Sequence, residues 1–298
     1  MTQNLPNLII AGAHKAATTS IYTYLAAHPD VYGSGKKEIH YFTPLRAGEE
    51  TDPIEQYEKY FEGRKNEKYA IDASPSYMYG GEAIRNRMLQ VLPPHKVIII
   101  LREPVDRFLS NYNWLRAKLY TPAEEDLETF INKCIDEAKK PITNTNFYGR
   151  SIEEGMYMRF VPGWVDVYKH DIKIIYFENV ITDPKSVMID LAKWLDIDPT
   201  PFSNMQFTAE NKTVFVKNKA MHSFALKMNK KFEIFLRRNH GLKTKIRNVY
   251  YLFNKQGKKK DSTDDKSKQL LIDTYKESNK QLAQYLKSKN IKISDWLR

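Results

Sequence analysis

NLIIAGAHKAATTSIYTY, residues 7–24 of this 298-residue chain, is the stretch that decides the fold. Its first part, residues 7–11, is a short apolar run typical of a buried parallel strand. A loop of small residues follows, and apolar residues then recur at helical spacing as far as His28 and Pro29. The sequence therefore predicts a strand, a tight turn and a helix.

The loop between this strand and this helix has the composition of an anion-binding site. Backbone N–H groups at a helix N-terminus have no partner within the helix, and together with the helix dipole they bind oxyanions. Lys15 adds a positive charge, and the hydroxyls of Thr18 and Thr19 add hydrogen-bond donors. We interpret the loop as a phosphate site, with a generic anion-binding turn as the alternative.

The loop differs from the phosphate-binding loop of ATP-dependent enzymes. That motif requires Gly-x-x-x-x-Gly-Lys-Ser/Thr, in which the hydroxyl after the Lys binds magnesium. Here Gly12 precedes Lys15 by three residues, no Gly stands directly before the Lys, and Ala16 follows it. A nucleotide kinase or NTPase that uses this loop therefore remains only an alternative.

Residues 15–20, KAATTS, resemble the 5′-phosphosulfate loop of the sulfotransferase superfamily, which binds 3′-phosphoadenosine 5′-phosphosulfate (PAPS). The resemblance implies that the nucleotide is bound by Lys15, Ala16, Ala17, Thr18, Thr19 and Ser20. Family members usually carry Gly at the position of Ala17. Because Gly permits a positive φ and Ala disfavours it, we expect the turn to keep a negative φ at Ala17.

A second signature follows the apolar run KVIIIL at residues 96–101, which predicts a buried strand. Pro104 suits the first turn of a helix, and Arg102 and Ser110 can then converge on one anion, for which the guanidinium fork is well shaped. The segment resembles the superfamily's 3′-phosphate signature, Leu-Arg-x-Pro-x-x-Arg-x-x-Ser-x-Tyr. Within it, Arg107 is expected to make structural ion pairs.

The two signatures together imply more than either does alone. Each is an anion site at the point where a parallel strand's carboxyl end meets a helix, which is where open α/β sheets bind ligands. One nucleotide with phosphates at its 5′ and 3′ positions would occupy both sites, whereas ATP would need only the first. The expected cofactor is therefore PAPS, with 3′,5′-ADP as product and no metal.

Residues 36–42, KKEIHYF, carry the candidate catalytic groups. If this stretch is extended, Glu38 and His40 point to the same side. It resembles the Lys-Glu-x-x-x-Phe segment of the glycan-type sulfotransferases, whose Glu is the general base. The resemblance implies that Glu38 is the base and His40 an auxiliary group at the acceptor. The alternative is a Glu38 that merely pairs with Lys36 or Lys37 on the surface.

The acceptor is less well defined by the sequence. Residues 74–77, SPSY, resemble the family's segment near the acceptor, and heparan sulfate enzymes often carry Lys where Ala73 stands, which argues against a heparan-like chain. Asp72 either orients the acceptor or closes the strand. A hydroxyl or amine of a small natural product, a glycolipid or a glycan remains compatible.

Later segments of the chain are expected to complete the nucleotide site. Residues 153–168 predict one amphipathic helix, in which Tyr157 resembles a residue beside the nucleotide. Residues 207–222 resemble a basic loop of the family that closes over the 3′-phosphate and adenine, so Lys217 or Lys219 is expected to bind there. A solvated basic loop is the alternative.

Composition places limits on the class of protein. The net charge is +11 and the pI about 9.3, so the surface attracts anions, and a non-enzymatic module that binds anionic polymers or membrane surfaces is a further alternative. No nucleic-acid motif appears, which argues against a nucleic-acid partner. The single cysteine, Cys134, excludes an internal disulfide and a Cys-based zinc site. Oligomeric state is not indicated.

The sequence predicts one sulfotransferase domain over residues 1–298, with an α/β nucleotide-binding core at 1–200 and a basic loop and helical part at 201–298. The expected fold is a central, mainly parallel sheet with helices on both faces. The chain shows neither a leader nor an apolar run as long as the roughly 20 residues that a membrane span needs. We therefore expect a cytoplasmic enzyme that moves a sulfuryl group in line from PAPS to its acceptor.

Overall fold

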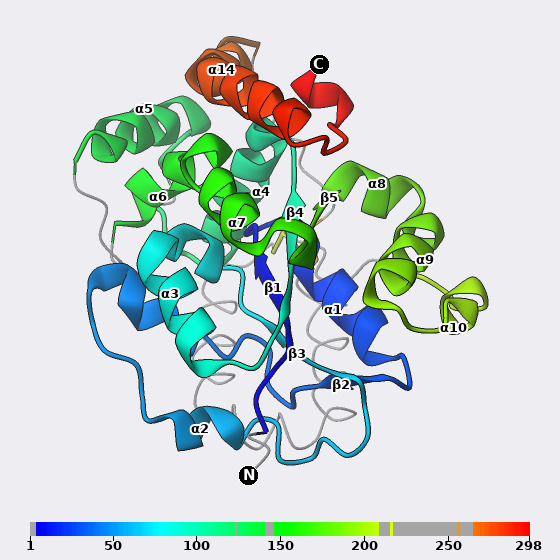
Figure 1. Cartoon of the computed structure of the whole chain (residues 1–298). Coiled ribbons are helices and arrows are strands. Elements are labelled where there is room, and N and C mark those ends of the chain that lie inside the picture. The colour runs from blue at the N-terminus through cyan, green and yellow to red at the C-terminus, as the bar shows by residue number, and fades with distance from the viewer. Residues whose placement is uncertain (1–3, 123, 141–145, 209–214, 217–254, 257–264) are drawn as a thin grey trace.

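A five-stranded parallel sheet forms the centre of the molecule, in the strand order β2-β3-β1-β4-β5 (Figure 1). The strands are β1 (Leu8–Gly12), β2 (Val31–Gly33), β3 (Tyr69–Ala73), β4 (Lys96–Leu101) and β5 (Ile172–Tyr176). The computed structural model describes residues 4–122, 124–140, 146–208, 215–216, 255–256 and 265–298. The predicted α/β class and parallel sheet are confirmed.

The three central strands are buried on both faces of the sheet. Every residue of β1 and β3 is buried, as are all residues of β4 except Lys96. In β1, Leu8 pairs with Ile71 of β3 on one side and with Lys96 of β4 on the other. A strand covered on both faces reads as a continuous apolar run rather than an alternating one, which is why the sequence identified these strands.

Helices cover both faces of this sheet, as predicted. Helices α1 (Thr18–Ala26) and α9 (Pro184–Leu195) pack on one face, and α3 (Gly81–Val91) and α7 (Val161–Tyr168) on the other (Figure 1). The connections from β1 to β2 and from β3 to β4 run in opposite directions across the sheet. Because such crossovers are right-handed, their helices fall on opposite faces.

A second apolar cluster joins the C-terminal helix to the part of the chain after β4. It is formed by α4 (Pro104–Ala117), α5 (Leu127–Ala138), α6 (Phe147–Glu153) and α14 (Asp265–Ser288). Phe108, Phe130 and Tyr275 have no exposed surface in it, and the thiol of Cys134 is buried there too. These helices lie beyond the carboxyl ends of the strands, at the top of Figure 1.

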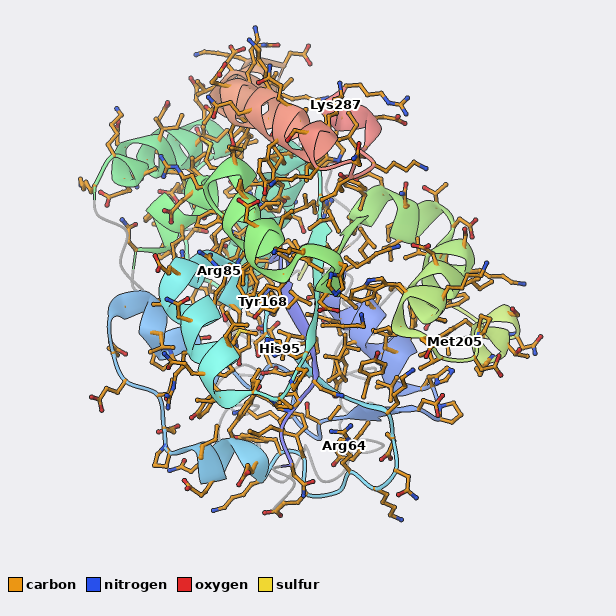
Figure 2. All side chains as sticks on the ribbon, viewed as in Figure 1. Arg64, Arg85, His95, Tyr168, Met205 and Lys287 are labelled. Carbon is orange, nitrogen blue, oxygen red and sulfur yellow. The ribbon has the colours of Figure 1, made fainter. Side chains whose placement is uncertain are left out.

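Individual hydrogen bonds also fix the helices on the sheet. Figure 2 labels His95, before β4, and Tyr168, at the end of α7, whose Nε2 and Oη atoms lie 2.8 Å apart. The remaining elements are α2 (Ile54–Glu58), α8 (Phe177–Thr182), α10 (Thr200–Ser203), β6 (Phe215–Val216), β7 (Lys255–Gln256) and the 3₁₀ helices η1 (Thr43–Ala47), η2 (Tyr77–Gly80), η3 (Tyr157–Arg159), η4 (Lys169–Asp171) and η5 (Asp295–Leu297).

The single helix predicted for residues 153–168 is wrong. Helix α6 ends at Glu153, the short η3 follows, and α7 begins at Val161 with Pro162 in its first turn. Proline has no N–H to donate and its ring clashes with the preceding turn, so it is tolerated at a helix start and not in the interior. Pro162 was the signal for a new helix.

Two expectations concerned the whole chain, namely the lack of a membrane span and the organisation into one domain. In the part of the chain that the structure describes, no helix is both long and apolar enough to span a membrane. The assignment of residues 1–298 to one domain stays a prediction.

Candidate active site

The two predicted anion loops lie next to each other, because they follow the adjacent strands β1 and β4. The N–H of Ala13 donates to the carbonyl of Ile100 at 2.9 Å, and Arg102 Nη1 donates to the carbonyl of Lys15 at 3.0 Å. The Arg102 side chain therefore closes the first loop from the side of the second. The structure brings together the two groups that the sequence assigned to opposite ends of one nucleotide.

The loop after β1 is more sharply curled than the sequence suggested. Lys15 has φ 66° and Ala17 has φ 61°, both in the left-handed region. The predicted negative φ at Ala17 is therefore wrong. This conformation costs an L-residue about 1–2 kcal/mol, and strain of this kind concentrates at binding and catalytic sites.

Helix α1 begins directly behind this loop with an open N-terminus. In the described chain no side chain caps it, and its first turn has no acidic residue. The structure places the predicted loop residues around this terminus: Ala16, Thr18 and Ser20 are buried, and Ala17 and Thr19 are partly exposed. Uncapped N–H groups and the helix dipole favour an anion here.

Positive charge is concentrated around Lys15. Burial, followed by the charges of Arg102 and Arg107, lowers the pKa of Lys15 to about 8, although Glu38 acts in the opposite direction. Its Nζ atom lies 5.5 Å from the ring centre of Trp114, within the range of a cation–π contact. An anion bound here would relieve the repulsion among these cations.

The guanidinium of Arg102 is held in place by its contacts but still has an N–H donor without a hydrogen-bond partner among the described residues. Its Cζ atom lies 4.1 Å from the ring centre of Phe177. Its Nε atom is buried and has no hydrogen-bond partner within the described residues. Ser110, two turns into α4, is partly exposed, and no described residue hydrogen-bonds its hydroxyl. Arg102 and Ser110 thus offer unused donors to an anion.

The N-terminus of α4, unlike that of α1, is occupied. The side chain of Glu103 accepts from the N–H of Asp106 at 2.7 Å, and the N–H of Glu103 donates to Glu178 Oε1 at 2.9 Å. Anion binding at this junction must therefore depend on side chains rather than on helix N–H groups.

Tyr157 hydrogen-bonds to the backbone of Arg102. Its side chain has no exposed surface, and its hydroxyl donates to the carbonyl of Arg102 at 2.9 Å and faces the N–H of Arg102 at 3.4 Å. Burial raises the pKa of Tyr157 well above its ordinary value, so the hydroxyl is a neutral donor. A direct contact between Tyr157 and the nucleotide stays a prediction.

Among the described residues, none makes the ion pair with Arg107 that the sequence led us to expect. Its side chain has no exposed surface, and its Nη2 donates to the carbonyl of Ser151. Its Nε and Nη1 atoms have no partner, and no carboxylate of the described chain forms an ion pair with it. Arg107 is therefore an internal positive charge behind the Lys15 loop.

Glu38 and His40 are in contact, but the extended conformation on which their expected placement on one side depended is not present, because residues 34–40 form no strand and His40 has φ 63°. Glu38 Oε2 lies 3.1 Å from His40 Nε2, and Glu38 Oε1 lies 3.3 Å from Lys37 Nζ. The alternative pairing with Lys37 is thus also present. Burial alone would raise the pKa of Glu38, but the hydrogen bond from His40 and the charges of Lys37 and His14 lower it to about 2.

The segment after β3 lies against these two side chains. Ser76 Oγ lies 3.1 Å from His40 Nδ1, and Ser74 Oγ accepts from the N–H of His40 at 3.0 Å. Asp72, in contrast, has no exposed surface, and its carboxylate accepts from Tyr57, Tyr77 and Ser74, each at 2.8 Å. Of the two roles considered for Asp72, these contacts favour the structural one.

A partly buried ionic network, which no sequence motif indicated, lies beside the Lys15 loop. His14 Nδ1 lies 2.9 Å from Glu154 Oε2, and Arg46 Nη1 donates to Glu154 Oε1 at 3.1 Å. The N–H of His14 also donates to Tyr79 Oη at 3.1 Å. These contacts fix the residue that precedes Lys15. His14 and Glu154 are 140 positions apart in sequence, so no local sequence pattern could predict their contact.

Two further predictions concern groups that would complete the site. Within the described residues, no three His, Cys, Asp or Glu side chains gather where they could hold a metal ion. Lys217 and Lys219 lie outside the described residues, and their role stays a prediction.

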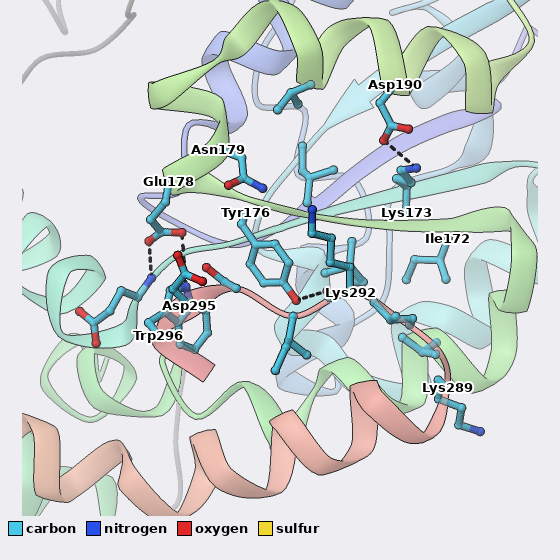
Figure 3. A pocket seen from close by; sticks show the side chains of 18 of the residues that line it. Ile172, Lys173, Tyr176, Glu178, Asn179, Asp190, Lys289, Lys292, Asp295 and Trp296 are labelled. Atoms are coloured by element: carbon cyan, nitrogen blue, oxygen red, sulfur yellow. Dashed lines mark hydrogen bonds and ion pairs between the residues drawn. The ribbon is translucent and has the colours of Figure 1, made fainter. Parts of the chain in front are cut away.

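The cavity of about 1640 Å³ shown in Figure 3 does not lie at the Lys15 loop. It runs along the free edge of β5, between α8 and α9 on one side and the C-terminal residues 289–298 on the other. On the side of the Arg102 junction it is lined by Glu103, Asp106, Glu178 and Trp296.

The sequence matches the family described as "Sulfotransferase domain" over residues 5–248, and the chain belongs to that family. It is 32% identical to the membrane-associated sulfotransferase kil1 of Dictyostelium discoideum over 157 residues, which is 50% of this chain and 32% of that protein. It is 23% identical over 307 residues to the bifunctional heparan sulfate N-deacetylase/N-sulfotransferase 1 of Caenorhabditis briggsae, covering 99% of this chain and 32% of the relative. The chain thus spans about a third of the length of these two relatives.

A crystal structure of a sulfotransferase from Alicyclobacillus acidocaldarius has the same fold. The TM-score is 0.68 at 20% identity, and the match covers 98% of this chain and 99% of the other. The sulfotransferase fold expected from the two signatures is therefore confirmed.

Proposed function

We propose that this protein transfers a sulfuryl group from PAPS to a hydroxyl or amine of an acceptor. The observation that supports this most strongly is the position of Arg102 against the carbonyl of Lys15, 3.0 Å away, at the carboxyl ends of neighbouring strands. Two cationic loops this close suit one ligand that carries phosphate at both ends. A nucleoside triphosphate needs only the first loop.

The residues present fit such a ligand. Lys15 and the open N-terminus of α1 would bind the 5′-phosphosulfate and neutralise the charge that develops on the leaving phosphate, which is usually the largest catalytic contribution. Arg102 and Ser110 would bind the 3′-phosphate through donors that no described residue uses. Held at both ends, the nucleotide would present its sulfur in line with the acceptor.

Glu38 would act as the general base. As the acceptor oxygen or nitrogen forms its bond to sulfur, the bond from sulfur to the bridging oxygen breaks, and the acceptor proton passes to the Glu38 carboxylate. A pKa of about 2 keeps Glu38 ionised but makes it a weak base in the free protein. The negative charge of a bound nucleotide nearby would raise this pKa toward that of an effective base.

The acceptor remains a small natural product, a glycolipid or a glycan. One relative at 23% identity is named for heparan sulfate, but Ala73 stands where heparan sulfate enzymes often have Lys. We propose that residues 1–298 form one catalytic domain and that the enzyme acts in the cytoplasm. No nucleic acid or inserted membrane segment is part of this proposal.

Nucleotide binding tests the proposed function directly. We expect 3′,5′-ADP to bind without added magnesium and at least about tenfold more tightly than ATP with magnesium, because only 3′,5′-ADP supplies the second phosphate contact. Isothermal titration calorimetry measures both, and transfer of label from ³⁵S-PAPS to a panel of acceptors then identifies the acceptor. Tighter binding of magnesium-ATP would favour a kinase or NTPase. Salt-sensitive binding of anionic polymers with no preference for a 3′-phosphate would favour the non-enzymatic module.

The pKa of Lys15 predicts how this binding depends on pH. Lys15 is charged below about pH 8 and loses its charge above it in the free protein, whereas a bound anion favours the charged form. The affinity for 3′,5′-ADP should therefore fall by up to about tenfold per pH unit above that value.

Titrations from about pH 7 to about pH 9.5 measure this effect, since the phosphates of 3′,5′-ADP are already ionised there. K15M should bind more weakly and show little pH dependence, and K15R should move the decline to higher pH because its charge persists. A wild-type affinity that stays constant across the range would contradict the assignment of Lys15 to the anion site.

A further inference from the structure

The peptide group between Arg102 and Glu103 is held at both of its polar atoms. Its carbonyl oxygen accepts from the hydroxyl of Tyr157 at 2.9 Å, and its N–H donates to Glu178 Oε1 at 2.9 Å. Because a peptide group is planar, two bonds on opposite sides fix its orientation. The direction in which the Arg102 side chain leaves the backbone is therefore set by Tyr157 and Glu178.

Trp296, two residues from the C-terminal Arg298, contacts both of these supports. Its Nε1–H donates to Glu178 Oε2 at 3.3 Å, as Figure 3 shows. Its ring centre lies 6.2 Å from that of Tyr157 and 6.2 Å from that of Tyr176 at the end of β5. The neighbouring Leu297 is 5% exposed and part of the main core, so this end of the chain is anchored.

The placement of Glu178 is hard to explain by charge alone. A carboxylate close to a phosphate site repels the ligand, and a neutral acceptor would avoid that cost. Glu178, however, uses its two oxygens for two different donors, Glu103 and Trp296. In an amide side chain one of these two positions would be an NH₂ group, which is a donor and would face the N–H of Glu103 or the Nε1–H of Trp296. The preceding residue, Phe177, contacts the guanidinium of Arg102 itself.

We propose that Glu178 and Trp296 are positioning residues of the 3′-phosphate site, through which the C-terminal end of the chain fixes the orientation of Arg102. The inference rests on the proposed function, in which Arg102 binds the 3′-phosphate. In this proposal neither residue is itself a ligand of the nucleotide. Their effect is confined to the phosphate that Arg102 holds, and this distinguishes them from residues that merely stabilise the fold.

The test compares two nucleotides that differ only in the 3′-phosphate. In the wild type, 3′,5′-ADP should bind more tightly than 5′-AMP. W296F keeps an aromatic ring against Tyr157 but removes the Nε1–H donor. We expect its dissociation constant for 3′,5′-ADP to rise about tenfold, while that for 5′-AMP changes less than about twofold. The ratio of the two constants, measured by calorimetry, should therefore fall.

E178Q provides a second, independent variant. Its NH₂ group would face either the N–H of Glu103 or the Nε1–H of Trp296, so one of the two hydrogen bonds is lost and the same ratio should fall. Because the two residues act through one chain of contacts, W296F/E178Q should lose little more than the worse single variant. D295N is the matched control: the Asp295 side chain is 88% exposed and pairs with Arg298 at 2.9 Å, and it bonds to none of the residues in this chain of contacts. Its ratio should equal that of the wild type.

Each outcome has a definite meaning. A reduced ratio in W296F and E178Q, with D295N unchanged and thermal unfolding midpoints preserved, supports the inference. Retention of the wild-type ratio in both variants, or equal weakening of both nucleotides, overturns it. If the wild type itself does not distinguish 3′,5′-ADP from 5′-AMP, the proposed function fails, and that result is separate from a failure of the two variants.

Discussion

Replacing Glu38 by Gln is expected to slow sulfuryl transfer from PAPS by about 10²- to 10⁴-fold, the usual contribution of a positioned general base. Gln has nearly the same size and can still accept a hydrogen bond from His40, so the local structure should persist. It cannot take up the acceptor proton, however. The affinity for 3′,5′-ADP should rise by less than about threefold, since the substitution removes a negative charge near the proposed nucleotide site and leaves the Lys15 loop in place.

Initial rates with ³⁵S-PAPS, on the acceptor found by screening or on water, measure the loss, and calorimetry measures 3′,5′-ADP binding. E49Q is the matched control, because Glu49 is an exposed carboxylate only eleven positions away. It should be as active as the wild type. Wild-type rates in E38Q would remove Glu38 from the mechanism and leave its pairing with Lys37 as its only role.

Replacing Arg102 by Ala should weaken binding of 3′,5′-ADP by about 100-fold, as expected for the loss of hydrogen bonds between charged groups in a partly buried site. Adenosine 5′-phosphosulfate lacks the 3′-phosphate, so its affinity should fall much less. R102K should give an intermediate loss for 3′,5′-ADP, because Lys keeps the charge but not the planar fork.

Competition binding with the two nucleotides tests this directly. R159A serves as control, since the side chain of Arg159 is 60% exposed and its carboxylate partner, Glu153, lies 3.7 Å away. Equal losses for both nucleotides in R102A would mean that Arg102 acts elsewhere, for example by closing the Lys15 loop through the carbonyl of Lys15.

Structural features that depend on a short, continuous run of residues were predicted well from the sequence. The apolar run at 96–101 coincides with β4, and Pro104 marks the first residue of α4. Asp183, directly before Pro184, is a typical N-cap residue, and its side chain caps α9 by accepting from the N–H of Ser186 at 3.0 Å. Each of these depends on interactions within a few residues, and such interactions are visible in sequence. The adjacency of the two anion loops followed because neighbouring parallel strands end at the same edge of the sheet.

The wrong predictions have two causes. Some structural features depend on interactions between residues far apart in sequence, and in other places a single residue overrides the local sequence pattern. Helical periodicity across 153–168 concealed the break that Pro162 requires. At Ala17 intrinsic preference favours a negative φ, but the closure of the loop imposes φ 61°. The contacts of His14 with Glu154 and of Glu178 with Trp296 join residues more than 100 positions apart. Only the folded chain brings these pairs together.

The buried guanidinium of Arg107 has a consequence for the ligand-free protein. Lys15, Arg102 and Arg107 are like charges that act on one another inside the molecule, and no described carboxylate pairs with Arg107. The charge of Glu154 offsets part of this repulsion at Arg107. An anion bound at the Lys15 loop would offset more of it, so binding of such a ligand should raise the free energy of unfolding.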